Sequence, residues 1–322
     1  MSAIMRICFV LVACVLALAA AACGGGDDDD DGGQTAATTT APAGDDDDDP
    51  GPGGEPEAFE ETYPINETFW HQGFMIEIGD AIHAGTEPDI FGEQEFTLVI
   101  EADFTNEGAD NRSLGSDVAM ITPGGALNPL FGGIPSVPGG STISGEFVFR
   151  VPEGFTLDDA YLLVGDGGEQ QARVPLGPGG GELIALEPSE PPLSGTISTS
   201  LVDLDFTSAE LRYDDPVNHQ QVDDEKQALT LNFDATSRRS GNWSIFAQEF
   251  SLTLPSGSTI AVDGILLPGL PGSDAGLTTP DNYVRFLVDD PAEGDYVLNF
   301  LPSDRWYAEG EPTEYNLEFT LD

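Results

Sequence analysis

Phe96–Phe104, with the sequence FTLVIEADF, has an apolar residue at every second position, and most of the residues between them are polar. Successive side chains of a β-strand point to opposite faces of a sheet, so this alternation predicts a strand with one buried face. The same design recurs far along the chain at Leu229–Ala235, with the sequence LTLNFDA.

Short runs of the same kind fill the region from Phe59 onward and are separated by turn residues. The chain holds 39 Gly and 24 Pro, as in a turn-rich all-β protein, and no segment of ten or more residues has a helical stripe. An all-β sandwich is therefore predicted. The further expected strands are Phe147–Val151, Ala160–Val164, Asp203–Leu211, Phe246–Leu254, Tyr283–Val288, Tyr296–Leu301 and Tyr315–Leu321.

The body of the chain also looks duplicated. Four features of the first half recur in the same order in the second half. We expect corresponding strands for the pairs Phe104 and Ala235, Met120–Gly124 and Leu252–Gly257, Phe147–Val151 and Val284–Val288, and Tyr161–Val164 and Tyr296–Asn299.

Charge is the extreme compositional feature, because 58 acidic residues face 10 basic ones and the formal net charge is −48. A field of this sign repels nucleic acid, so nucleic acid is not an expected partner. The acidic residues are spread along the whole chain, which favours a solubility adaptation to salty surroundings; cation binding is the alternative interpretation.

The first 23 residues have the pattern of an export signal. A short segment with one positive charge, Met1–Arg6, precedes the apolar run Ile7–Leu18, and four alanines then lead to Cys23. Ala20-Ala21-Ala22-Cys23 resembles the lipobox of bacterial lipoproteins, with Ala where that family usually has Leu. The resemblance implies cleavage before Cys23, lipidation of Cys23 and anchoring at the extracytoplasmic face of the cell membrane. An ordinary secretory signal is the alternative.

All three cysteines, Cys8, Cys14 and Cys23, lie in this segment, so the mature chain would keep Cys23 alone and form no disulfide within itself. The residues after Cys23 include the runs Asp27–Asp31 and Asp45–Asp49. They cannot bury apolar surface and are expected to form a disordered acidic tether, which resembles that of actinobacterial lipoproteins.

The first half contains Pro138-Gly139-Gly140-Ser141 followed by Gly145–Pro152, with the sequence GEFVFRVP. This run resembles the telokin-like, immunoglobulin-like domain of bacterial lipoproteins and secreted proteins, a family of unknown function. The resemblance implies an immunoglobulin-like sandwich and no catalytic residues. The predicted organisation is a signal peptide at 1–22, a tether at 23–58, and two tandem immunoglobulin-like domains at 59–187 and 188–322.

No catalytic constellation is apparent. His71, His83 and His219 form no zinc pattern, and His71 is expected at the surface or at a strand start. No nucleophile elbow or phosphate-binding lysine loop occurs. Aromatic residues at Phe69, Trp70 and Phe74, and at Trp306-Tyr307, are expected to fill the core or the space between domains, or else to anchor a partner or a glycan.

No cofactor is expected, and no metal site is assigned. Calcium bound by acidic sandwich loops is the alternative to simple solvated loops. The loop carboxylates concerned are Asp103, Asp110 and Asp117, then Asp214, Asp215, Asp223, Asp224 and Glu225, then Asp289, Asp290, Glu293 and Asp295.

The leading functional hypothesis is a non-enzymatic, surface-tethered binding or interaction module of the cell envelope, with a protein or glycan partner. A structural envelope component without a specific ligand is the first alternative. The second is a carboxylate-based hydrolase, which would need a cleft with two carboxyl groups about 5–10 Å apart.

Overall fold

The computed structural model describes residues 58–86, 93–115, 118–133, 135–240, 244–266, 275–289, 291–302 and 314–321. Contacts group Gly54–Asp322 into one compact unit. The described residues are nearly all β, which confirms the predicted fold class, and the one helix among them is the 3-10 turn Ala247–Glu249. None of the described helices could cross a membrane. The predicted signal peptide and all of the tether except Ala58 lie outside the described residues.

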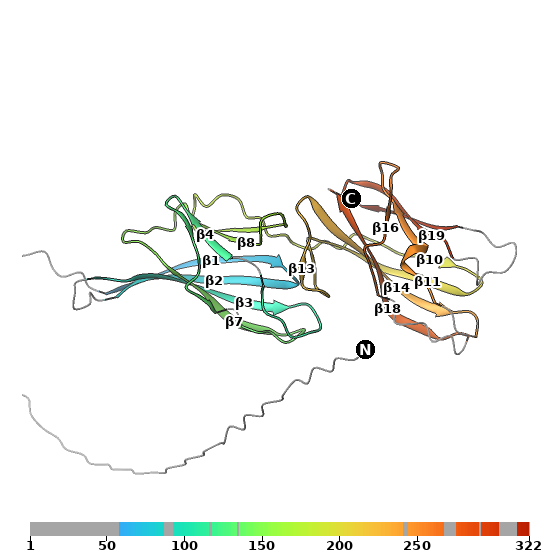
Figure 1. Cartoon of the computed structure of the whole chain (residues 1–322), viewed down its shortest axis with the longest axis horizontal. Helices are drawn as coiled ribbons and strands as arrows, with labels where there is room; N and C mark the ends of the chain where they lie inside the picture. The colour runs from blue at the N-terminus through green and yellow to red at the C-terminus, as the bar shows by residue number, and fades with distance from the viewer. Residues whose placement is uncertain are drawn as a thin grey trace, which may run out of the picture. The chain divides into compact units, whose positions relative to one another are not determined.

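The first sandwich consists of two antiparallel sheets packed around one core (Figure 1). Its core combines Phe104 and Phe147 from one sheet with Met120 and Leu162 from the other. In spatial order, the five-stranded sheet is β1 (Phe59–His71), β2 (Phe74–Gly85), β3 (Phe96–Asn106), β7 (Thr142–Arg150) and β6 (Phe131–Gly133), and the four-stranded sheet is β5 (Gly125–Leu127), β4 (Val118–Thr122), β8 (Tyr161–Val164) and β9 (Ala172–Pro175).

The second sandwich has a separate core, in which Phe233 and Phe286 meet Phe250 and Leu298. In spatial order, its five-stranded sheet is β10 (Gly195–Ser198), β11 (Val202–Arg212), β14 (Lys226–Ser237), β18 (Thr278–Asp289) and β17 (Gly264–Leu266), and its four-stranded sheet is β16 (Thr259–Ala261), β15 (Phe250–Thr253), β19 (Gly294–Phe300) and β20 (Tyr315–Leu321).

The two strand orders are identical once strands are matched in chain order. The sheet β1-β2-β3-β7-β6 corresponds to β10-β11-β14-β18-β17, and β5-β4-β8-β9 corresponds to β16-β15-β19-β20. All four sequence correspondences fall on matched strands, so the two halves of the chain share one strand order. The second copy has an addition: its connection between β11 and β14 contains a small hairpin of β12 (Asp214–Asp215) and β13 (Gln220–Gln221).

The connection between the sandwiches is hydrogen-bonded at both ends. The backbone NH of Trp70 in β1 donates to the carbonyl of Ala185 at 2.8 Å, and Ser189 exchanges two backbone hydrogen bonds with Leu211 in β11. The predicted boundary between residues 187 and 188 falls within this short bridging segment, which leaves few residues for a flexible hinge.

The long β1–β2 hairpin was not among the expected strands, because its apolar alternation is interrupted. Bulges shift the register between Pro64 and Glu67 and between Ile78 and Ala81, so the inward positions change parity along each strand. The expected strand Phe246–Leu254 is shorter than predicted, since it begins only at Phe250, after the 3-10 turn.

The expectation that His71 lies at the surface is wrong. His71 is the last residue of β1 and its side chain is 0% exposed, because the parity that buries Phe69 also points His71 inward. Burial lowers the pKa of His71 to about 4, against the opposing effect of Asp214 and Asp166. The imidazole is therefore neutral at pH 7.

This burial predicts a specific loss of stability in acid. Below pH 6.5 the unfolded chain binds a proton at His71, whereas the folded chain resists it until about pH 4. The free energy of unfolding should therefore fall by up to about 3 kcal/mol between pH 6.5 and 4 from this residue alone. Urea unfolding of H71Q should show a correspondingly flatter pH dependence than the parent over this range. The two curves should run parallel between pH 7 and 8, and equal slopes in acid would contradict the assignment.

Candidate functional site

The β12–β13 hairpin of the second sandwich packs against the first sandwich. We call the contacts of residues 212–226 with three segments of the first sandwich the junction. These segments are the β1–β2 turn at Gln72-Gly73, the residues Glu107-Gly108 after β3, and the β8–β9 loop at Gly165–Gln170.

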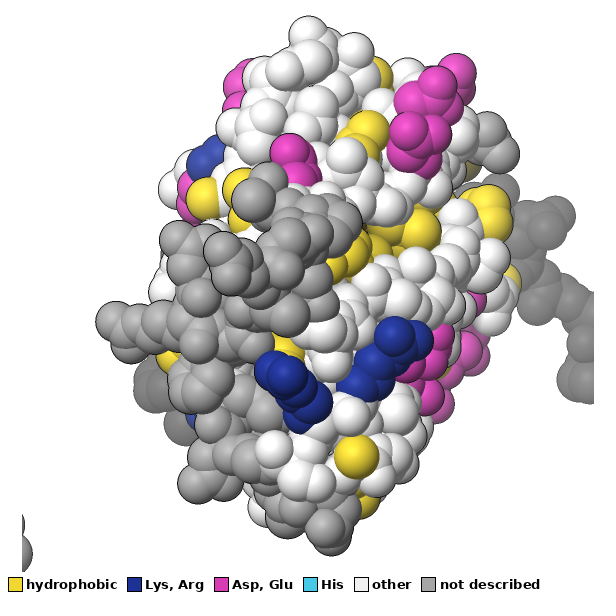
Figure 2. Space-filling view, turned by 90° about the vertical axis from the view of Figure 1, so that its right-hand side faces the viewer, with side chains coloured by type: hydrophobic (Ala, Val, Ile, Leu, Met, Phe, Trp, Pro, Cys, Tyr) yellow, Lys and Arg dark blue, Asp and Glu magenta, His cyan; other side chains and the backbone are white. Residues whose placement is uncertain are grey.

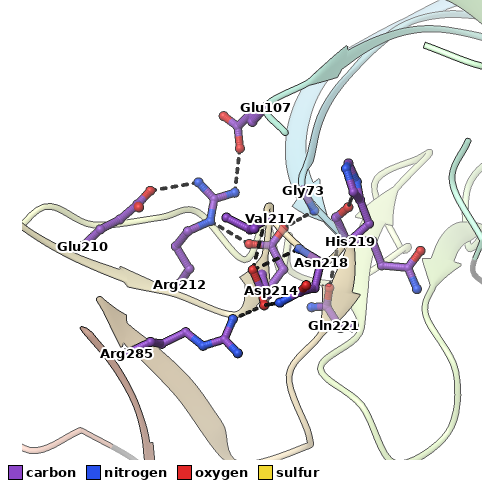
Figure 3. A network of polar contacts seen from close by, with 12 residues as sticks. Gly73, Glu107, Glu210, Arg212, Asp214, Val217, Asn218, His219, Gln221 and Arg285 are labelled. Carbon is purple, nitrogen blue, oxygen red and sulfur yellow. Dashed lines mark hydrogen bonds and ion pairs between the residues drawn. The ribbon is translucent and has the colours of Figure 1, made fainter. Parts of the chain in front are cut away.

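Arg212 lies at the centre of the junction and joins carboxylates from both sandwiches (Figure 3). Its guanidinium contacts Asp214 at 2.6 Å, Glu210 at 2.9 Å and Glu107 of the first sandwich at 2.5 Å. The side chains of Arg212 and Asp214 are 7% and 3% exposed, so this pair is withdrawn from water, whereas Glu107 and Glu210 are about a third exposed. The surrounding carboxylates raise the pKa of Arg212 despite its burial, so its charge is permanent.

Asp214 also accepts a hydrogen bond from the backbone of the first sandwich. The NH of Gly73 donates to its second carboxylate oxygen at 2.5 Å, and the NH of Gln72 donates to the side chain of Gln221 at 3.0 Å. His219 lies against the carbonyl of Gln72, with its Nδ1 at 3.2 Å. Each strand of the small hairpin therefore has its own bond to the same turn of the first sandwich.

Two glycines allow this close approach. A Cβ on Gly73 would lie 2.7 Å from the Cα of Pro216, and a Cβ on Gly108 would lie 2.5 Å from Nε2 of His219. Gly73 has φ +76, a conformation that favours glycine in any case. The hairpin thus packs so closely against Gly108 that no side chain larger than hydrogen fits there without a shift.

Backbone pairing extends the junction beyond the hairpin. The NH of Gln170 donates to the carbonyl of Val222 at 3.0 Å, and the NH of Asp224 donates to the carbonyl of Gly168 at 3.1 Å. The side chain of Gln170 adds a bond to the carbonyl of Lys226 at 3.2 Å. The turn between β8 and β9 is thereby joined to the segment that leads into β14.

A polar pocket of about 330 Å³ lies beside Arg212. Its floor is the outward face of β14 and β18, and the hairpin residues Asp215, Pro216 and Val217 with Glu107 form its sides. A second hollow, a trough of about 840 Å³, lies on the matching sheet face of the first sandwich and is lined by Glu67, Glu77, Glu101, Asp103 and Glu146, among other residues.

Several of the loop carboxylates suggested for calcium have other contacts. Asp214 and Asp215 are engaged by Arg212 and Arg285, and Asp103 accepts a hydrogen bond from Ser144. Asp117 and Asp290 lie outside the described residues. Within the described ranges, no group of three or more His, Cys, Asp or Glu side chains is arranged to hold a metal ion.

The remaining singled-out residues fill structural positions where they are described. Phe69 and Phe74 are core residues, and His83 packs edge-on against the rings of Phe59 and Phe155. Trp306 and Tyr307 lie outside the described residues, as does Cys23. On the face in Figure 2, some hydrophobic side chains gather in a hollow, and no site is assigned there.

Arg212 was not among the residues predicted from the sequence to be functional, although a signal was available. Basic residues are scarce in this chain. Several of the described ones form ion pairs with carboxylates, as Arg150 does with Glu95 and Arg238 with Asp203. An arginine at the end of an alternating strand, followed closely by Asp214-Asp215, could have been identified as a member of an ion pair. Its contact with Glu107 could not, because 105 residues separate the two.

Comparisons with protein family models, curated proteins and solved structures gave no match to this chain.

The junction predicts a large stability difference between two arginine variants. R212M should lower the free energy of unfolding by about 3–5 kcal/mol, because it leaves the buried carboxylate of Asp214 without a counter-charge. R150M is the matched control: its ion pair with Glu95 is more than 60% exposed on both sides, so it should cost less than about 1 kcal/mol. Urea denaturation measures both, and similar losses would contradict the central position of Arg212.

A glycine pair tests the docking of the hairpin directly. G108A should separate the hairpin from the first sandwich, because the added Cβ meets His219 and the carbonyl of Pro216 at 2.6 Å or less. Hydrogen exchange at residues 214–222 should accelerate at least tenfold in G108A. G167A, whose Cβ meets nothing within 4 Å, should leave exchange unchanged. Protected hairpin amides in G108A would show that the docking does not depend on this contact.

Proposed function

We propose that this chain is a lipid-anchored, non-enzymatic binding module of the cell envelope. Its body consists of two sandwiches that a buried ionic network holds together, with open polar hollows on matching sheet faces. Binding sites that exist before the ligand arrives lose less conformational freedom on association, so a preformed body of this kind suits recognition.

The pocket beside Arg212 is the observation that carries this proposal. Its sides come from a hairpin that the second copy of the repeat has in addition, and from Glu107 of the first copy. The side chains of Arg212 and Arg285 are fixed by ion pairs with Asp214, Asp215 and Asp263. A concave site with few, fixed polar groups is the usual form of a small-ligand pocket.

The hydrolase alternative receives less support from the geometry. Glycoside hydrolysis needs two carboxyl groups in different environments, one of which keeps its proton. The trough does bring carboxylates together, and Glu101 and Glu146 are direct cross-strand partners. Both are solvent-exposed on the same open face, so burial distinguishes neither of them as a proton donor.

The anchor is part of the proposal. Lipidated Cys23 would hold the chain at the extracytoplasmic face of the cell membrane, and the acidic residues 24–58 would separate the body from it. The repeated sandwich supports the resemblance to telokin-like, immunoglobulin-like domains, which we retain as part of the same proposal, with the domain limits 59–187 and 188–322.

Binding to isolated cell envelope tests the function. The lipidated full chain, labelled and inserted in vesicles, should bind envelope fragments saturably at several salt concentrations and be displaced by an excess of unlabelled chain. G108A should weaken this binding at least tenfold, and G167A should not. Absence of saturable binding at every salt concentration would overturn the proposal in favour of a structural component.

Fractionation tests the anchor in the same preparation. C23S should move the protein from the membrane fraction to the soluble exported fraction, because no acyl chain can then attach. C8S and C14S, which alter only the predicted signal peptide, should leave it in the membrane. Retention of C23S in the membrane would contradict lipid anchoring at this residue.

A further inference from the structure

The duplication places two hollows on corresponding sheet faces but gives them different chemistry. In the first sandwich, Glu101 of β3 pairs directly with Glu146 of β7. On the matched strands of the second sandwich, Asn232 of β14 pairs directly with Tyr283 of β18. The face of the first sandwich is thus open and acidic at this position. The corresponding face of the second sandwich carries the amide of Asn232 and the phenol of Tyr283, and the hairpin covers part of its edge.

The floor of the second hollow is a compact set of side chains. Thr230 lies opposite Arg285, and Asn232 lies opposite Tyr283 in the next outward-facing row. All four side chains are half-buried and line the same pocket. The volume of about 330 Å³ is at the lower end of the range for small-molecule sites, so the pocket suits a single ring rather than a large ligand.

Each charged side chain in the described lining of this pocket is already in an ion pair. Arg212 is engaged by Glu107, Glu210 and Asp214. Arg285 is engaged by Asp215 and Asp263. Four carboxylates and two guanidinium groups line the pocket, so a free anion meets a net negative wall. A cation meets two fixed positive groups and carboxylates that already have partners.

Uncharged hydrogen-bonding groups remain available on the floor. The hydroxyls of Thr230 and Tyr283 and the amide oxygen of Asn232 make no hydrogen bond with other described residues, while the amide nitrogen of Asn232 donates to Ser208 at 3.1 Å. The ring of Tyr283 and the side chains of Pro216 and Val217 supply apolar surface in the same pocket. The site therefore offers hydroxyl and amide partners and an apolar surface, while its charged side chains are already in ion pairs.

We infer that this pocket binds one uncharged sugar ring. Sugar hydroxyls both donate and accept, as the groups of Thr230, Asn232 and Tyr283 require, and the apolar C–H face of a ring can pack against the tyrosine. This inference rests on the proposed binding function and names its ligand class and site. Tyr283 and Asn232 are its principal binding residues.

Titration of the full chain with matched monosaccharides tests the inference. Glucose and N-acetylglucosamine are the neutral probes, and glucuronic acid and glucosamine are their anionic and cationic counterparts. Calorimetry and saturation-transfer NMR should detect saturable binding of at least one neutral probe, and at least tenfold weaker binding of both charged probes. Absence of binding by either neutral probe, or equal binding of a charged one, would overturn the inference.

Variants locate the binding at this pocket. N232A and Y283F should each weaken the neutral sugar by about tenfold, as expected for one lost hydrogen bond. Y63F is the matched control, because Tyr63 is an exposed tyrosine of the first sandwich that bonds Glu61. Both site variants alter half-buried outward-facing side chains, and urea denaturation checks that they remain folded. Unchanged affinity in folded N232A and Y283F would overturn the assignment.

The envelope assay separates this inference from the proposed function. If no neutral sugar binds but the chain still binds envelope saturably, the sugar site is wrong and the binding function stands. If neither occurs, both are wrong. Saturable sugar binding that N232A and Y283F each weaken by about tenfold, together with weaker envelope binding by the same variants, would support both.

Discussion

A single buried arginine underlies the arrangement of this molecule. Arg212 contacts Asp214 and Glu210 on its own sandwich and Glu107 on the other, in a setting where its side chain is 7% exposed. Desolvating these charges is costly, and only complete pairing compensates for the cost. The hairpin must therefore lie where Glu107 can be the third carboxylate around Arg212. This requirement makes the contact between the two sandwiches specific.

The docked hairpin also explains how duplicated sandwiches acquire different surfaces. Strand order is the same in both copies, so the outward face of each sheet in one copy corresponds to that of the matching sheet in the other. The insertion of β12 and β13 partly walls one face and leaves the other open. A short insertion in one connection is thus enough to turn a repeated scaffold into one with two distinct hollows, because loops can change while the sheets and cores are retained.

Extreme acidity and a defined polar interior coexist because two of the few cations, Arg212 and Arg285, are nearly buried. With 58 acidic residues and 10 basic ones, the chain has too few cations for most of its carboxylates to form an ion pair. Arg212 and Arg285 instead pair with carboxylates that are nearly buried, Asp214 and Asp215. The exposed ion pair between Arg150 and Glu95 contributes little by comparison, since water and salt screen it.

The sequence alone determined the all-β fold class, most of the long strands and the duplication, because alternation with period two and recurring turns are local signals. It missed the β1–β2 hairpin, where bulges disturb that period. It also placed His71 at the surface, because the position of His71 next to Trp70 does not show which face of the strand its side chain is on. Only the tertiary structure decided the junction and its pocket. Glu107 and Arg212 are 105 residues apart, and their contact depends on how two separately packed cores present their loops to each other, which no local pattern encodes.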